Sequence, residues 1–220
     1  MNIPDTLLGE EWCWAAWVVW LLFFARSLWR APWRRLGDSE QLNVWLGMVV
    51  LLMVVWSMLA GVKPGLSLHL LGATVFTLCF GPHLAFIGLS LVTAGVILNG
   101  DSSFVVFAVN ALLLAGVGVG SSHLFYRLFY RFFPKHFFVY IFINGFFAAA
   151  LNVLVVGLCI TLFMTVLDIY SWEYLSAEYL PYFFLLAFSE AWLSGMALTV
   201  FVLYRPSWVL TFDDSLYMSD

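Results

Sequence analysis

The chain has 220 residues, of which 64% are hydrophobic and only 10% carry a formal charge. Soluble domains carry about 25% charged residues, so this composition excludes both an ordinary soluble fold and a disordered chain. The net charge of −4 excludes a strongly basic nucleic-acid binder, and three cysteines are too few for a disulfide-rich scaffold. The composition therefore predicts an integral membrane protein.

Hydrophobic runs recur along the whole chain. They lie at about 12–29, 41–62, 67–80, 83–99, 104–126, 136–167 and 180–204. These runs are continuous rather than alternating, which favours helices over the strands of a membrane barrel. We therefore expect an all-α integral membrane protein with about seven transmembrane helices. Residues 1–220 are expected to form a single polytopic membrane domain.

The basic residues predict the orientation of these spans. Eight of the nine follow the first, fifth or seventh span: Arg26, Arg30, Arg34, Arg35, Arg127, Arg131, Lys135 and Arg205. These eight residues lie on one side of the membrane only if 67–80 and 83–99 are two separate crossings. Basic residues concentrate in cytoplasmic loops, which favours two crossings. The N-terminus then lies outside and the C-terminus inside. Gly81 and Pro82 supply the reversal between the two crossings.

The beginning of the chain does not look like a cleavable signal peptide. Such peptides begin with basic residues. Here the first charged residues are Asp5, Glu10 and Glu11, all of them acidic. We therefore expect Met1 to remain the mature N-terminus.

Three polar residues within or beside the spans are candidates for chemistry. Glu190 lies about ten positions inside the last span, where a carboxylate is costly and faces the bundle or a wet cavity. It is either a functional group for a cation or proton, or a hydrogen-bonded structural acid. His69 begins the third span and is either a transition-metal ligand or an interfacial side chain. Asn110 lines the same cavity as His69 or forms a hydrogen bond between helices.

Sequence motifs for catalysis are missing from the chain. It contains no HExxH, GxSxG or P-loop sequence, so we do not expect an enzyme. Without a nucleotide site, the chain would need partner subunits to power active transport. Gly116, Gly118 and Gly120 lack the strand-to-helix context of a nucleotide loop and instead favour close helix contact.

Several short segments follow one another in an order that is typical of one family. They are MNIPD at 1–5, PGLSLHLLGA at 64–73, NGD at 99–101 followed by Asn110, Ser-Glu at 189–190 and Arg-Pro at 205–206. Together they resemble the CbiM/NikM family, the membrane substrate-binding subunits of energy-coupling-factor nickel and cobalt transporters. The matches run over nearly the whole chain.

The resemblance implies a metal site that includes the N-terminus. In that family the metal is held by the terminal amine, by the amide nitrogen and imidazole of the second residue, and by a later histidine. Carried over, the ligands here are Met1, Asn2 and His69, with Asn110 and Glu190 supporting them through hydrogen bonds. Position 2 departs from the family pattern, because an amide replaces an imidazole. Affinity should then fall and selectivity change, unless the site is vestigial.

The resemblance also implies a function and partners. The chain would be a multi-pass protein of the bacterial inner membrane that takes up a divalent ion, nickel or cobalt, without a permanently bound cofactor. Its partners would be the lipid bilayer, a coupling transmembrane subunit and ATPase subunits. No nucleic-acid partner is expected. The alternative is a CbiM-like membrane scaffold or accessory subunit without transport activity, such as an assembly factor. Asn2 favours the alternative, whereas His69 and the acidic outer side favour transport.

Overall fold

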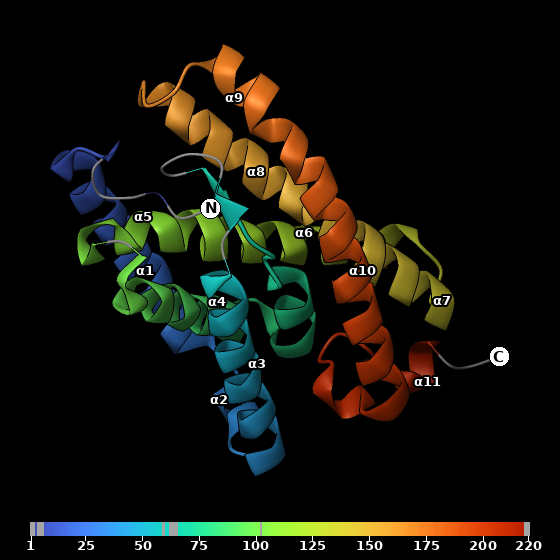
Figure 1. The fold of residues 1–220 in the computed structure, drawn as a ribbon. Coiled ribbons are helices and arrows are strands. Elements are labelled where there is room, and N and C mark those ends of the chain that lie inside the picture. The colour runs from blue at the N-terminus through green and yellow to red at the C-terminus, as the bar shows by residue number, and fades with distance from the viewer. Residues whose placement is uncertain (1–2, 4–6, 59, 62–65, 102, 218–220) are drawn as a thin grey trace.

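The chain folds almost entirely into helices in the computed structural model, which describes residues 3, 7–58, 60–61, 66–101 and 103–217. Figure 1 shows the ribbon coloured along the chain. Within the described residues, 6 helical segments are long and apolar enough to cross a membrane. They are Glu10–Arg30, Ser39–Ser57, Ala73–Asn99, Phe104–Phe132, Phe137–Val166 and Trp172–Tyr204. The prediction of an all-α membrane protein is therefore confirmed.

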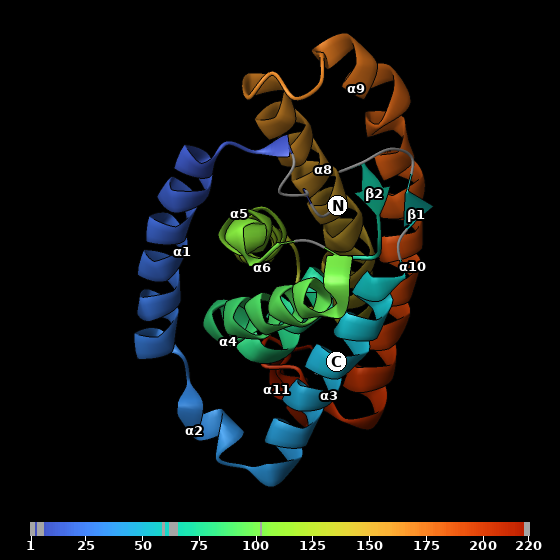
Figure 2. The ribbon, with the colours of Figure 1, turned by 60° about the vertical axis from the view of Figure 1, so that its left-hand side comes forward.

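The first half of the chain contains three spans and a small strand pair. Its elements are α1 (Glu10–Arg30), α2 (Trp33–Leu36), α3 (Ser39–Ser57), β1 (Ala60–Gly61), β2 (Ser67–Leu68), α4 (Ala73–Val96) and the π-helical turn η2 (Ile97–Asp101). The strands β1 and β2 pair antiparallel. Figure 2 shows α1 along one side of the molecule and α10 along the other, with α4, α5 and α6 between them.

The second half contains the other three spans and a C-terminal segment. The fourth span comprises the 3₁₀ turn η3 (Phe104–Val106), α5 (Phe107–Ala111), the π-helical turn η4 (Leu112–Gly116) and α6 (Val117–Phe132). The fifth comprises α7 (Phe137–Val139), the π-helical stretch η5 (Tyr140–Phe147) and α8 (Ala148–Val166). The sixth comprises α9 (Trp172–Glu178) and α10 (Leu180–Tyr204), and η6 (Pro206–Trp208) and α11 (Asp214–Tyr217) follow it.

The third span is a helical hairpin rather than a straight helix. Gly81 has φ 75° and ψ 169°, and these angles interrupt α4 at the predicted Gly81-Pro82 reversal. A straight helix would separate Phe76 and Gly88 by about 18 Å. Instead the Phe76 ring lies against Gly88, in a space that a Cβ atom would fill. The two arms of α4 therefore fold back on each other, and the 6 segments are roughly consistent with the predicted number of about seven.

The first arm of this hairpin is shorter than the predicted span 67–80. It covers residues 73–80, and eight helical residues rise only about 12 Å, against a bilayer core of about 30 Å. Residues 69–72 before it are not helical. Non-helical backbone at membrane depth is tolerated only where protein surrounds it and satisfies its polar groups. Within this segment Leu71 is fully buried and His69 is buried, so the protein does surround it.

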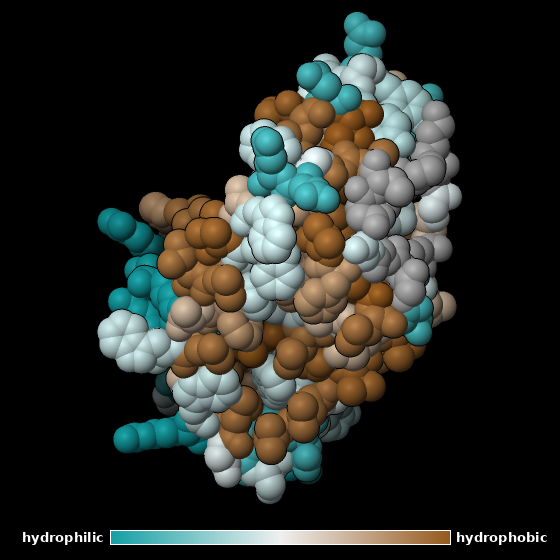
Figure 3. All heavy atoms as spheres, turned by 90° about the vertical axis from the view of Figure 1, so that its left-hand side faces the viewer, coloured by the Kyte–Doolittle hydropathy of each residue, from teal (hydrophilic) through white to brown (hydrophobic). Residues whose placement is uncertain are grey.

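The outer surface of the bundle is strongly apolar. Trp14, Leu22 and Trp29 on α1 expose 67%, 68% and 85% of their surface, and α10 exposes Phe184, Leu185 and Phe188 in the same way. Figure 3 shows hydrophobic residues over most of one face, with hydrophilic residues in small separate groups. A soluble monomer does not expose apolar area on this scale. The exposed side chains are those of a protein surrounded by lipid.

Small residues bring two long spans close together. A Cβ atom placed on Gly145 in η5 would lie 3.3 Å from the Cα atom of Gly195 in α10. The backbones of η5 and α10 therefore approach more closely than ordinary side chains allow. Gly118 serves a similar contact, because its Cβ atom would lie 3.1 Å from that of Ala73. Gly120 does not, since nothing lies within 4 Å of the same position.

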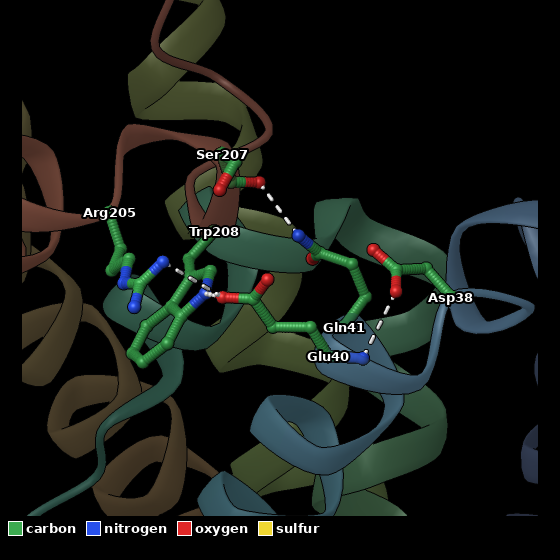
Figure 4. A network of polar contacts seen from close by, with 6 residues as sticks. All are labelled: Asp38, Glu40, Gln41, Arg205, Ser207 and Trp208. Carbon is green, nitrogen blue, oxygen red and sulfur yellow. Dashed lines mark hydrogen bonds and ion pairs between the residues drawn. The ribbon is translucent and has the colours of Figure 1, made fainter.

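A polar network ties the start of α3 to the segment after α10 (Figure 4). The indole nitrogen of Trp208 donates to Glu40 Oε1 at 2.8 Å, and Arg205 Nη1 lies 3.7 Å from the same oxygen. Gln41 Nε2 donates to the carbonyl of Ser207 at 3.0 Å. Arg35 also donates to that carbonyl, at 2.8 Å, so basic residues from two distant parts of the chain lie at one end of the bundle.

Candidate metal-binding site

His69 lies in the non-helical segment that leads into the short arm of α4. This segment ends at Gly72, which has a left-handed backbone with φ 66°. A Cβ atom at Gly72 would clash with the side chain of Leu52. Glycine is therefore required at this position both by its backbone conformation and by the close approach of α3. The turn at Gly72 fixes where the extended residues 69–71 enter the bundle.

The imidazole of His69 is buried and only partly satisfied. Its exposed fraction is 3%, and Nδ1 lies 3.0 Å from the carbonyl oxygen of Leu70. A carbonyl only accepts, so Nδ1 carries the proton and Nε2 keeps its lone pair. Nε2 has no hydrogen-bond partner in the described part of the chain.

Trp56 at the end of α3 holds the His69 ring in place. The two ring centroids are 4.7 Å apart, and the Trp56 indole nitrogen donates to the carbonyl of Leu71 at 3.2 Å. Trp56 is fully buried. Sequence reasoning missed this residue, because a tryptophan near the end of a span is equally typical of an interfacial belt.

Glu190 fixes the same segment from the opposite side. Its Oε2 accepts the backbone N–H of Leu71 at 2.8 Å, and its Oε1 accepts that of Gly72 at 2.6 Å. Ser194, one turn further along α10, donates to Oε1 at 3.4 Å. These N–H groups precede the short arm of α4, where a helix leaves its first donors unpaired and favours negative charge. Glu190 therefore accepts hydrogen bonds from the backbone N–H groups at the start of the short α4 arm, inside the bundle.

Asn110 in α5 holds the N-terminal segment. Its Oδ1 accepts the backbone N–H of Ile3 at 2.8 Å, and its Nδ2 donates to the carbonyl of Ile3 at 3.1 Å. Both Ile3 and Asn110 have an exposed fraction of 0%. Ile3 belongs to the same buried apolar cluster as Trp56 and Leu71. The side chain of Asn110 thus forms hydrogen bonds with both the N–H and the carbonyl of Ile3, and it anchors this residue within the bundle.

The described residues contain only part of the predicted site. Met1 and Asn2 lie outside them, so their proximity to His69 stays a prediction. No three His, Cys, Asp or Glu side chains lie together among the described residues in a way that could hold a metal ion. His69 and Glu190 are connected through Leu71 and Gly72 rather than by direct contact. What the described geometry offers is one buried, unpartnered imidazole nitrogen in a rigid setting.

Asn152 is a polar residue within a span that has structural contacts. Asn152 in α8 donates to Thr74 at 3.1 Å and accepts from Ser121 at 2.5 Å, which links three spans. Such hydrogen bonds between helices stabilise membrane bundles. Cys79 and Cys159 form no disulfide, and Cys13 and Cys79 are buried.

A family model described as "Cobalt uptake substrate-specific transmembrane region" (CbiM) matches residues 2–208. No curated protein matches the sequence significantly. A crystal structure of a transition metal transporter aligns with a TM-score of 0.70 and 16% identity, over 91% of this chain and 92% of the other. A truncated transition metal transporter aligns with the same score and identity, over 92% and 98%. At this identity the two structures are evidence for the fold.

Proposed function

Because the chain belongs to the CbiM family of cobalt uptake transmembrane regions, a family of membrane components of metal transporters, we propose that it is the substrate-binding subunit of an energy-coupling-factor-type transporter. Its substrate is a divalent transition-metal ion, nickel or cobalt, which it receives from the outer side of the bacterial inner membrane. A coupling transmembrane subunit and ATPase subunits supply the energy, because the sequence contains no nucleotide-binding motif.

One observation carries this proposal: the buried Nε2 atom of His69 has no partner among the described residues. A buried polar atom without a hydrogen bond costs free energy, and native structures rarely keep one without a reason. A neutral imidazole with Nδ1 bound to a carbonyl presents Nε2 in the tautomer used for metal ligation. The neighbouring contacts of Trp56 and Glu190 hold this segment in one conformation.

The remaining ligands in this proposal come from the N-terminus. The amine of Met1 and the amide nitrogen of Asn2 close a five-membered chelate ring, and His69 adds a third nitrogen. Nickel and related ions favour such nitrogen sets. The anchoring of Ile3 by Asn110 supports this arrangement, because the first two residues directly precede a buried, fixed peptide. Asn110 and Glu190 are then positioning residues for the two halves of the site.

Blocking the N-terminal amine tests this coordination. We expect an N-terminal extension, or acetylation of Met1, to abolish nickel binding to the purified protein, because both remove the amine as a ligand. The measurement is isothermal titration calorimetry in detergent. An extension at the C-terminus is the matched control and should leave the affinity unchanged. Equal nickel affinity with a free and a blocked amine would remove Met1 from the site.

Substitution of the second residue tests the same site in the opposite direction. We expect Asn2→His to raise nickel and cobalt affinity by at least about tenfold, because imidazole is a much better ligand for these ions than a side-chain amide. The charge-neutral variant Asn2→Gln is the control and should give no gain. If Asn2→His binds no more tightly than the natural chain, the second residue does not reach the metal.

A CbiM-like scaffold without transport activity is the second candidate, and Asn2 is the observation that favours it. The two functions predict different results for the unmodified protein. If nickel, cobalt, copper and zinc all fail to bind, the transport proposal fails and the scaffold function is favoured. Micromolar or tighter binding of one of these ions favours transport.

A further inference from the structure

A groove on the side of the bundle lies outside the candidate metal site. It runs between α1, α4 and the span that contains α6, and it encloses about 480 Å³. Its walls are mainly apolar, with Phe23, Phe86 and Leu113 among the lining side chains. The only charged or titratable groups in the lining are Arg26 and His83. The volume is within the range of about 300–1,000 Å³ that holds small ligands.

Two helices carry the same gradient from apolar to basic along this groove. On α1, Val19 and Phe23 are followed by Arg26 and Arg30 at helical spacing. On the span of α6, the residues on one face are Gly116, Gly120, His123 and Arg127, spaced by four, three and four positions. Both helices thus place small or apolar residues at one end and cations at the other.

Arginines from two spans and two imidazoles lie near one end of the groove. Arg26 and Arg30 on α1 and His123 on α6 lie close enough to influence His83 on α4, and Arg127 lies close enough to influence His123. Nδ1 of His83 lies 3.5 Å from the hydroxyl of Ser27. Among the described residues the one ion pair is Arg205 with Glu40, so no carboxylate pairs with this cluster. The cluster attracts an anion at the point where the apolar groove ends.

We propose that this groove binds one anionic phospholipid of the bilayer. An acyl chain lies between α1 and α6, where Gly116 and Gly120 leave room, and the headgroup phosphate lies at Arg26 and His83. Arginine pairs well with phosphate oxygens, and basic pockets between membrane helices recognise anionic headgroups. The apolar groove fits an acyl chain, and the cations fit an anionic headgroup. A purely apolar partner helix would leave the cations unpaired.

The first test compares lipids that share their acyl chains. The full-length protein in detergent is titrated with phosphatidylglycerol or phosphatidylcholine, and native mass spectrometry measures the lipid retained. We expect phosphatidylglycerol to bind at least about tenfold more tightly, since its net charge is not balanced within the headgroup. Equal binding of the two lipids would overturn the proposal. Inorganic phosphate is the third ligand. If millimolar phosphate displaces bound phosphatidylglycerol as strongly as the lipid itself does, the assignment of the groove to an acyl chain is wrong.

Two variants locate the site. We expect Arg26→Gln to remove the preference for phosphatidylglycerol, whereas Arg34→Gln, an equal change of charge on exposed α2 outside the groove, should keep it. Gly120→Leu should weaken both lipids, because its side chain occupies the groove without a clash. Monodisperse elution of each variant confirms folding. If Gly120→Leu leaves lipid retention unchanged but prevents association with a coupling subunit, the occupant is a protein and the lipid proposal is wrong.

Discussion

Replacement of His69 by alanine is expected to lower nickel affinity by at least about 100-fold, more than the loss of a merely supporting residue usually costs. The described structure gives this imidazole one free nitrogen, Nε2, and surrounds it with a fixed Trp56 ring and a carbonyl on Nδ1. Alanine removes the nitrogen and leaves the backbone contacts of Leu71 and Gly72 in place. Titration calorimetry of the purified protein measures the affinity.

Two controls separate ligation from folding. His136→Asn changes a histidine at the exposed N-cap of α7, where asparagine preserves the capping acceptor, so nickel affinity should not change. The thermal midpoint of His69→Ala in detergent should fall, because a cavity is left beside Trp56, but elution as a monodisperse species should show that the chain still folds. Nickel affinity of His69→Ala equal to that of the unmodified chain would exclude His69 as a ligand.

Replacement of Glu190 by leucine is expected to destabilise the protein strongly. The buried N–H groups of Leu71 and Gly72 would lose their acceptors, and each unsatisfied group costs about 1–3 kcal/mol. The carboxylate also lies where a helix start favours negative charge. We expect a large drop in the thermal midpoint in detergent, together with weaker nickel binding, because the segment that carries His69 would no longer be held on this side.

Milder substitutions at the same place give the matched comparison. Glu190→Gln keeps one oxygen for one N–H group but sets a donor against the other, so we expect an intermediate loss of stability. Ser194→Ala removes only the long contact of 3.4 Å, and its effect should be below about 1 kcal/mol. If Glu190→Leu melts at the temperature of the natural chain, the two backbone contacts are not important for folding.

Much of the fold was predictable because lipid restricts the choices. In hydrocarbon a spanning segment must satisfy its own backbone, so long apolar runs predict helices without further information. Gly81 and Pro82 also predicted the reversal inside the third span. The length of the first arm was not predictable, because the three leucines of residues 67–72 extend the apolar run of the helix after them without a local signal for its end. What ends the helix at Ala73 is Gly72 close to Leu52 and the distant Glu190.

The candidate site was predictable only as separate residues. Glu190 and His69 were noticeable as polar exceptions in apolar surroundings. That Glu190 binds the backbone next to His69 depends on a contact across 119 positions, which no local pattern encodes. The pairing of Asn110 with Ile3 spans 107 positions in the same way. The roles of Met1 and Asn2 come from resemblance to the family alone and stay predictions.

The contact of Glu190 with the beginning of the short α4 arm also restricts how the bundle can rearrange. Separation of the two would leave two donors without water in an apolar interior, at a cost of several kcal/mol. α10 and this arm should therefore move as a rigid body during any alternating-access cycle. The hinges of such a cycle would then lie at junctions without comparable contacts.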